Sequence, residues 1–172
     1  MTMKLLRGVM QKIENLNRIL YHVSSLAIVL SAFILTYEVI VRYILKIPTI
    51  WEIESSVYLT IMATYLGAAY GLKDGAHINI DLVTRLLPGA FTEKLSLVTS
   101  MISLVFCLLL AWKGWVMWWE ATSKGWHSES LWGPPLTIPY FFLPLGMTLL
   151  SLQYVSLISE IIEKRGGKSH GS

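Results

Sequence analysis

The chain has 172 residues, of which 54% are hydrophobic and only 15% are charged. Soluble domains carry about 25% charged residues, so this composition and its long apolar runs predict an integral membrane protein with a single domain. The net charge of +3 is modest, and lysine and arginine in a membrane protein set orientation, so we expect no nucleic-acid partner. The single cysteine, Cys107, excludes an internal disulfide or a multi-cysteine metal site.

The hydrophobic pattern predicts an all-α integral membrane fold with four transmembrane helices. About 20 helical residues cross the ~30 Å hydrocarbon core, and the apolar stretches at 20–45, 51–72, 95–115 and 138–162 have this length. Residues 1–18 are basic and amphipathic, which predicts either a short helix on the phospholipid surface or a solvent-exposed extension of the first span. Residues 163–172 are polar and glycine-rich, which predicts a flexible tail.

The first span contains two charged residues near its end, Glu38 and Arg42. Because they are four positions apart, they share one helix face and can pair. Charged groups within a span usually face protein or water. Three interpretations stay open here: a neutralised structural pair, a contact with a partner subunit, or direct handling of an ion or proton.

The second span begins with Glu52 and Glu54, where a helix N-terminus favours carboxylates. Small residues recur along it at helical spacing, and Gly67 and Gly71 among them predict close packing of another helix. The chain then becomes polar at 73–77, which predicts a cytoplasmic elbow before a short amphipathic helix near 81–87. We expect His77 and Asp81 to organise this elbow.

Tryptophans are concentrated between the third and fourth spans. Such rings gather at membrane–water interfaces because they are apolar but carry an N–H that needs a partner. The cluster predicts an aromatic belt or an outward docking surface, with Trp126 and Trp132 as the docking candidates. Its members are Trp112, Trp115, Trp118, Trp119, Trp126 and Trp132.

Basic residues predict the orientation. With four spans, both termini and the second loop lie on one side, which holds ten lysines and arginines. The other side holds four: Arg42, Lys46, Lys113 and Lys124. The larger number marks the cytoplasmic side, so both termini are predicted in the cytoplasm.

No catalytic constellation is visible in the sequence. No histidine or carboxylate is placed to activate a serine, and the phosphate-binding glycine loop is missing, so we expect neither an enzyme nor a cofactor in this chain. Only His22 lies within a predicted span, which leaves weak support for haem. Two other classes stay open: a membrane anchor or cytochrome-like subunit of an oxidoreductase, and a small homo-oligomeric exporter.

The order of several short motifs resembles the small, DctQ-like membrane subunit of tripartite ATP-independent periplasmic (TRAP) transporters. The similar fragments extend from the first span to the fourth. Ile53 separates the two glutamates that are often adjacent in the family, and the spacing back from Gly67 favours Glu54 as the counterpart. The fragments are Arg42-Tyr43, Trp51 with Glu52 and Glu54, Gly67-Ala68-Ala69, Gly75, His77, Asp81, Leu86-Leu87-Pro88, Ser130-Leu131, Ile138-Pro139 and Leu143-Pro144-Leu145-Gly146.

This resemblance implies an accessory scaffold subunit in a bacterial or archaeal inner membrane. Its implied partners are a large membrane subunit, which holds the substrate and sodium sites, and a periplasmic substrate-binding protein, which the small subunit helps to dock. The implied substrates are organic acids or other carboxylate-bearing solutes.

Overall fold

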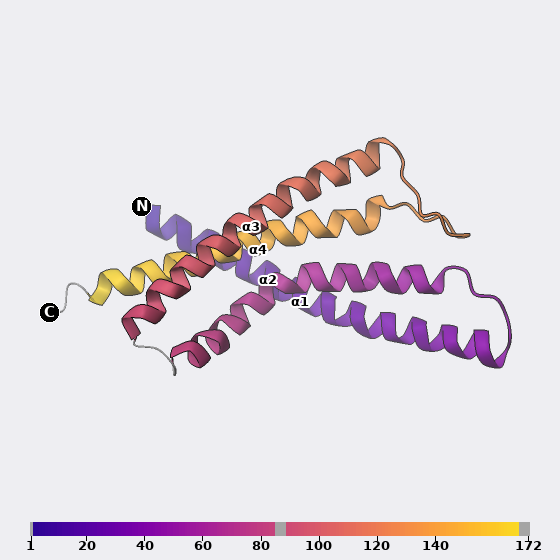
Figure 1. Ribbon diagram of the computed structural model, residues 1–172, viewed down its shortest axis with the longest axis horizontal. Coiled ribbons are helices and arrows are strands. Elements are labelled where there is room, and N and C mark those ends of the chain that lie inside the picture. The colour runs from indigo at the N-terminus through magenta and orange to yellow at the C-terminus, as the bar shows by residue number, and fades with distance from the viewer. Residues whose placement is uncertain (1, 85–88, 169–172) are drawn as a thin grey trace.

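A computed structural model describes the backbone of residues 2–84 and 89–168, and the side chains of 15–68, 70–72 and 94–162. Four α-helices, α1 (Thr2–Val39), α2 (Glu52–Thr84), α3 (Gly89–Ser123) and α4 (Thr137–Lys168), and one π-helix, η1 (Ile40–Ile44), form this part of the chain (Figure 1). It contains no strand, only the isolated bridge between His127 and Pro135. The predicted all-α class is confirmed.

Three helical segments are long and apolar enough to cross a membrane: Asn15–Ile44, Lys94–Ser123 and Thr137–Ile162. They correspond to the predicted first, third and fourth spans. Among the described residues, helix α2, which contains the predicted second span, supplies no segment that meets the same measure of length and composition. A membrane protein with several spans is therefore supported, and the second span, predicted at 51–72, stays a prediction.

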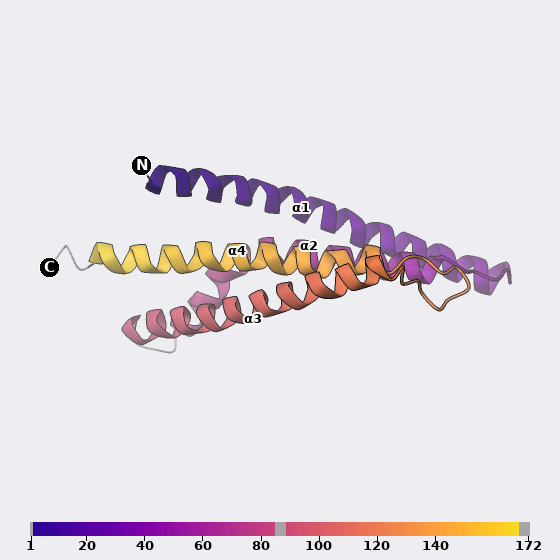
Figure 2. The same cartoon turned by 90° about the horizontal axis from the view of Figure 1, so that it is seen from above.

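Three sequence-based boundaries differ from the structure. Helix α1 is continuous from Thr2, so the N-terminal segment is the first part of a long helix and the separate short helix is wrong, because no proline interrupts this stretch. Helix α2 runs through 73–77 to Thr84, so the elbow does not break the helix, although its axis changes direction (Figures 1 and 2). Helix α4 extends to Lys168, which makes 163–168 helical; 169–172 lie outside the described residues.

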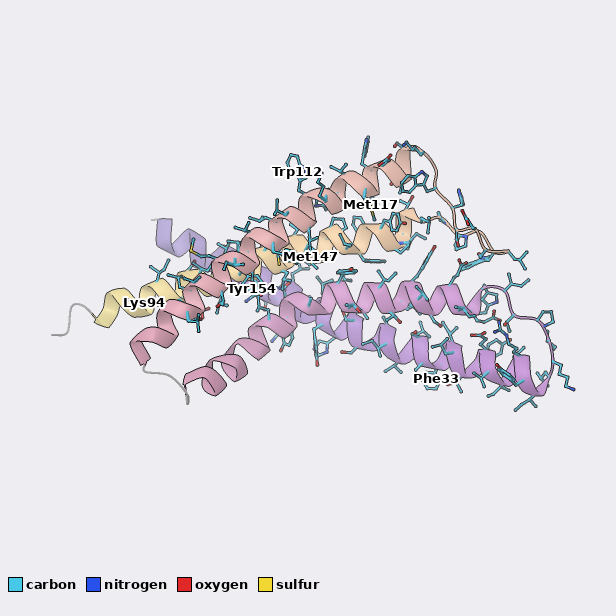
Figure 3. All side chains as sticks on the ribbon, in the orientation of Figure 1. Phe33, Lys94, Trp112, Met117, Met147 and Tyr154 are labelled. Carbon is cyan, nitrogen blue, oxygen red and sulfur yellow. The ribbon has the colours of Figure 1, made fainter. Side chains whose placement is uncertain are left out.

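The helices form two antiparallel hairpins, α1 with α2 and α3 with α4, which meet through α2 and α4. The connection 45–51 and the loop 124–136 lie at the same end of the molecule, and the two termini lie at the other end (Figures 1 and 2). We call the end that carries these two connections the loop end. Exposed apolar side chains project from the outer faces, as Phe33 on α1 and Trp112 on α3 illustrate (Figure 3).

Helices α1 and α3 each have a line of buried residues, spaced seven positions apart, along one face. Such a repeat keeps one face of a helix against its neighbour. In lipid, small side chains at the contact let the backbones approach closely. Every residue on the α1 stripe is polar, and every residue on the α3 stripe is small. The stripes are Asn17, Ser24, Ser31 and Glu38 on α1, and Ser100, Cys107, Gly114 and Ala121 on α3.

The α1–α2 contact combines small residues with hydrogen bonds. Ser31 Oγ donates to the Ser56 carbonyl oxygen at 3.1 Å, and Ser56 Oγ donates to the Ser31 carbonyl oxygen at 3.4 Å. Farther along, a Cβ added at Gly67 would lie 3.5 Å from Ser24, which is an ordinary packing distance. The predicted packing role of Gly67 therefore has a counterpart within this chain, whereas a Cβ at Gly71 would meet nothing within 4 Å.

Two other glycines lie closer to a neighbouring helix than Gly67 does. A Cβ at Gly114 on α3 would lie 3.1 Å from Pro144 Cβ on α4. A Cβ at Gly146 on α4 would collide with the Tyr65 backbone of α2, including its carbonyl carbon at 2.7 Å. Because a backbone cannot move aside as a flexible side chain can, Gly146 sets the distance between the two hairpins.

We expect Gly146→Ala to lower the free energy of unfolding by about 1–3 kcal/mol, because overpacking forces α2 and α4 apart. Unfolding followed by circular dichroism in mixed detergent–SDS micelles measures this change. The matched control is Gly71→Ala, which has open space around the new methyl group and should stabilise its helix by about 0.5–1 kcal/mol. Equal stability of the two variants would contradict a close α2–α4 contact at Gly146.

Candidate functional site

The most distinctive polar site joins the two hairpins at the loop end. Glu54, in the first turn of α2, accepts a hydrogen bond from Ser128 Oγ on one carboxylate oxygen and from Ser130 Oγ on the other, at 2.7 Å. Both serines belong to the loop between α3 and α4. We call these three residues the Glu54 clamp. Hydrogen bonds to an ionised group are about twice as strong as neutral ones, so the clamp holds the loop against α2.

The clamped loop also has a defined internal structure. The Trp126 N–H donates to the Ala121 carbonyl oxygen at 2.9 Å, and the Leu136 N–H donates to the Trp126 carbonyl oxygen at 2.9 Å. Gly133 has a φ of +61°, in the region that favours glycine, and its N–H donates to Ser130 Oγ at 3.1 Å. The clamp therefore acts on a loop whose shape is already restricted.

Glu52 has a different role, although it lies only two residues away. Its side chain is buried, and Oε2 accepts hydrogen bonds from the backbone N–H groups of Ile50 at 2.9 Å and Trp51 at 3.0 Å. It therefore closes the turn that leads into α2. Of the two predicted glutamates, Glu52 organises the connection between α1 and α2, and Glu54 reaches the other hairpin.

The structure contains the Glu38–Arg42 pair that the spacing predicts. Arg42 Nη2 lies 2.9 Å from Glu38 Oε1, and the guanidinium also donates to Thr49 Oγ1 from Nη2 at 2.7 Å and from Nε at 3.1 Å. Arg42 lies in η1, where the helix widens before the chain turns at Lys46, which has a φ of +56°. These contacts favour a neutralised structural pair that ties the end of α1 to the connection.

The two predicted docking tryptophans have different surroundings. The Trp126 ring is partly buried against Tyr140, with ring centroids 6.4 Å apart, and Lys124 Nζ lies 5.9 Å from its centroid. Trp132 is 45% exposed, and its neighbour Leu131 is 94% exposed. Trp126 therefore anchors the loop, while Leu131 and Trp132 form its free tip.

Two further predicted residues have no described side-chain environment. His77 and Asp81 lie in α2, but their side chains fall outside the described residues, so their role at the cytoplasmic end stays a prediction. No group of three or more His, Cys, Asp or Glu side chains that could hold a metal ion is present in the described ranges.

The sequence interpretation missed a second polar link between the hairpins. Asn17 on α1 and Gln153 on α4 are both buried, and Asn17 Nδ2 donates to Gln153 Oε1 at 3.2 Å. The polar residues that recur every seven positions on α1 could have indicated that Asn17 lies on the buried face. Nothing local identified Ser128 and Ser130 as partners of Glu54, because they lie 74 and 76 positions away.

The polar groups described above hold the protein's own helices and loop together, as in a structural membrane component. The chain belongs to the DctQ component family of tripartite ATP-independent periplasmic transporters, whose family model matches residues 31–164. This confirms the resemblance found in the sequence. The family is a transport component, so the expectation that the chain is not an enzyme is also confirmed.

Three curated relatives carry names from the same kind of transporter. The chain is 26% identical over 146 residues to the C4-dicarboxylate TRAP transporter small permease protein DctQ of Vibrio cholerae, covering 73% of the chain and 63% of the relative. It is 27% identical over 131 residues to the ectoine TRAP transporter small permease protein TeaB of Halomonas elongata, covering 76% and 67%. It is 29% identical over 101 residues to the sialic acid TRAP transporter small permease protein SiaQ of Vibrio cholerae, covering 59% and 54%.

We expect removal of the clamp to destabilise the protein through one shared interaction. Glu54→Ala and the double variant Ser128→Ala/Ser130→Ala should each lower the free energy of unfolding. The variant that combines all three substitutions should lose about 2 kcal/mol less unfolding free energy than the two separate losses added together. The reason is that the same charged hydrogen bonds are removed in each case and can be lost only once. Unfolding in mixed micelles measures each variant.

The control for these combined substitutions is the exposed ion pair between Glu120, near the end of α3, and Lys124, which follows α3. Exposed pairs of this kind couple by only about 0.3–0.5 kcal/mol. Additive effects of Glu54 and the two serines would show that the clamp does not form in the folded protein.

Proposed function

We propose that this chain is the small accessory subunit of a sodium-coupled TRAP-type uptake transporter. The observation that carries the proposal is the family match over residues 31–164, which includes the buried stripe of α3, the Glu54 clamp and both connections at the loop end. The polar residues at these places support the fold rather than form a substrate site. We therefore assign the substrate and sodium sites to a larger partner subunit.

The proposed partner in the membrane is this large subunit, which would pack against an outer face of the bundle. The exposed apolar residues on α1 and α3 supply faces for both a partner and phospholipid. Gly71 supports this assignment, because it lies on α2 with open space around it, and small residues let a neighbouring helix approach closely in lipid. A soluble periplasmic substrate-binding protein is the second proposed partner.

The proposed topology has four spans, with both termini in the cytoplasm of a bacterial or archaeal cell and the loop end in the periplasm. Two observations support it. The two hairpins place both termini at one end of the molecule (Figure 1), and the basic residues of the sequence are concentrated toward that end.

The proposed solutes are organic acids or other carboxylate-bearing compounds. The three relatives are named for C4-dicarboxylate, ectoine and sialic acid. Because similar small subunits carry such different solute names, we infer that the small subunit does not choose the solute.

Purification of the tagged chain from its native host in mild detergent tests the proposal. We expect a larger polytopic membrane protein to copurify at fixed stoichiometry, and deletion of either gene to abolish uptake of the same solute. Recovery of the chain alone with transport activity would support an exporter instead. A haem absorption band in the purified complex would support an oxidoreductase anchor.

The topology makes a separate prediction. In intact cells whose outer membrane has been permeabilised, a membrane-impermeant maleimide should modify Lys124→Cys but not Lys94→Cys. Both positions are exposed, and the native Cys107 is buried, so it adds little background. The opposite labelling pattern would reverse the orientation.

A further inference from the structure

A single lysine interrupts the apolar outer face of α3. Lys113 is exposed, and the side chains that share its face at helical spacing, Leu109 and Val116, are exposed and apolar. Its neighbour Trp112 projects from the outer side of the bundle (Figure 3). Charged side chains within a membrane span almost always face the bundle interior or a water-filled cavity. Lys113 departs from this placement.

The lysine lies well inside the helix rather than at its end. Ser123, the last residue of α3, is ten positions farther on, which is about 15 Å along the axis at about 1.5 Å per residue. On the packed side of α3, Gly114 lies against Pro144, which is seven positions inside α4. Residues 114–119 are again uncharged, so apolar sequence encloses Lys113 on both sides.

The lipid headgroups do not account for this position. The polar layer on each side of the hydrocarbon core is only about 5–7 Å thick. With Lys113 in that layer, the exposed Trp119 would lie in water, because it is about 9 Å farther along α3. Cα–Cβ bonds in a helix tilt toward its N-terminus, which for α3 is far from the loop end. A lysine stem of four carbons would therefore have to reach the nearer headgroups against this tilt.

The described side chains of the chain itself offer Lys113 no carboxylate. Glu120 is the nearest charged residue along α3, and it pairs with Lys124. Glu38 is buried and pairs with Arg42 at the end of α1. The charge of Lys113 is therefore left for a group outside the bundle.

The outer face of α1 provides a contrast. Exposed apolar residues such as Phe33 cover it, and the sequence contains no charged residue between Arg18 and Glu38. Lipid chains alone can satisfy such a face. The lysine thus distinguishes the α3 face from the α1 face, although both are broad and apolar.

We propose that Lys113 forms an ion pair with a carboxylate on a transmembrane helix of the large partner subunit. The outer face of α3 is then the subunit interface, and the outer face of α1 is left to phospholipid. This inference rests on the proposed function. Opposite charges attract strongly where the dielectric constant is low, and Trp112 adds a large apolar contact surface beside the pair. Any other register of the two subunits would leave both charges unpaired, so the pair also fixes how they align.

The first test measures assembly of the complex, purified in mild detergent through a tag on this chain. We expect Lys113→Met, which keeps the side-chain length but removes the charge, to lower recovery of the large subunit about tenfold. Lys113→Arg keeps the charge and should restore recovery to the wild-type amount. The control is Lys94→Met at the start of the same apolar segment (Figure 3), another exposed lysine, which should leave recovery unchanged.

The second test identifies the partner group directly. Dicyclohexylcarbodiimide enters apolar surroundings and activates carboxylates, and an amine in direct contact then forms an amide bond with the activated group. We expect treatment of the complex to join Lys113 to an aspartate or glutamate of the large subunit, as located by mass spectrometry of the digested product. The Lys113→Arg complex should assemble but give no such bond.

The outcomes separate this inference from the proposed function. A complex that forms equally well with Lys113→Met, and in which Lys113 forms no amide bond, would overturn the α3 interface alone and assign this face to lipid. An amide bond between two copies of this chain would overturn it in favour of a homo-oligomer. Failure of the wild-type subunits to form a complex would overturn the proposed function, and with it the partner named here.

Discussion

In a bilayer, apolar side chains gain little by leaving lipid for one another, so helices associate through close packing and polar bonds. The architecture of this chain follows from that constraint. Small or polar residues occupy the buried stripes of α1 and α3 at every seventh position, while large apolar residues face outward. The same constraint explains why the contact between hairpins is formed where Gly146 meets the Tyr65 backbone.

The two hairpins are joined at three levels along the bundle. Glu54 binds the α3–α4 loop at the loop end, Gly146 lies against Tyr65 farther in, and Asn17 bonds to Gln153 toward the termini. The buried bond between Asn17 and Gln153 favours one arrangement of the hairpins, because a shifted register would leave both amide groups unpaired. These three links hold the two hairpins as one unit.

The sequence predicted the features that depend on local patterns. Apolar length identified the helices, and a spacing of four identified the pair of Glu38 and Arg42. Contacts between distant residues could not be predicted, because the partners of Glu54 lie 74 and 76 positions away. Gly67 and Gly71 have the same local signature, yet of these two only Gly67 lies against a neighbour among the described residues. The end of α2 was misplaced because polar residues at 73–77 suggested a break, although neither proline nor a left-handed residue interrupts the helix.

The lengths of the helices have a consequence for the surrounding membrane. Helix α1 has 38 residues, which at about 1.5 Å per residue gives about 57 Å, nearly twice the hydrocarbon thickness of about 30 Å. Even a tilt of about 40°, the upper end of the usual range, leaves several turns in the headgroup layer and the water beyond. With the topology proposed above, those turns carry Lys4, Arg7 and Lys12. Each such charge near an anionic leaflet contributes about 1 kcal/mol, so the lipid composition of the inner leaflet would help to set the height and tilt of the whole bundle.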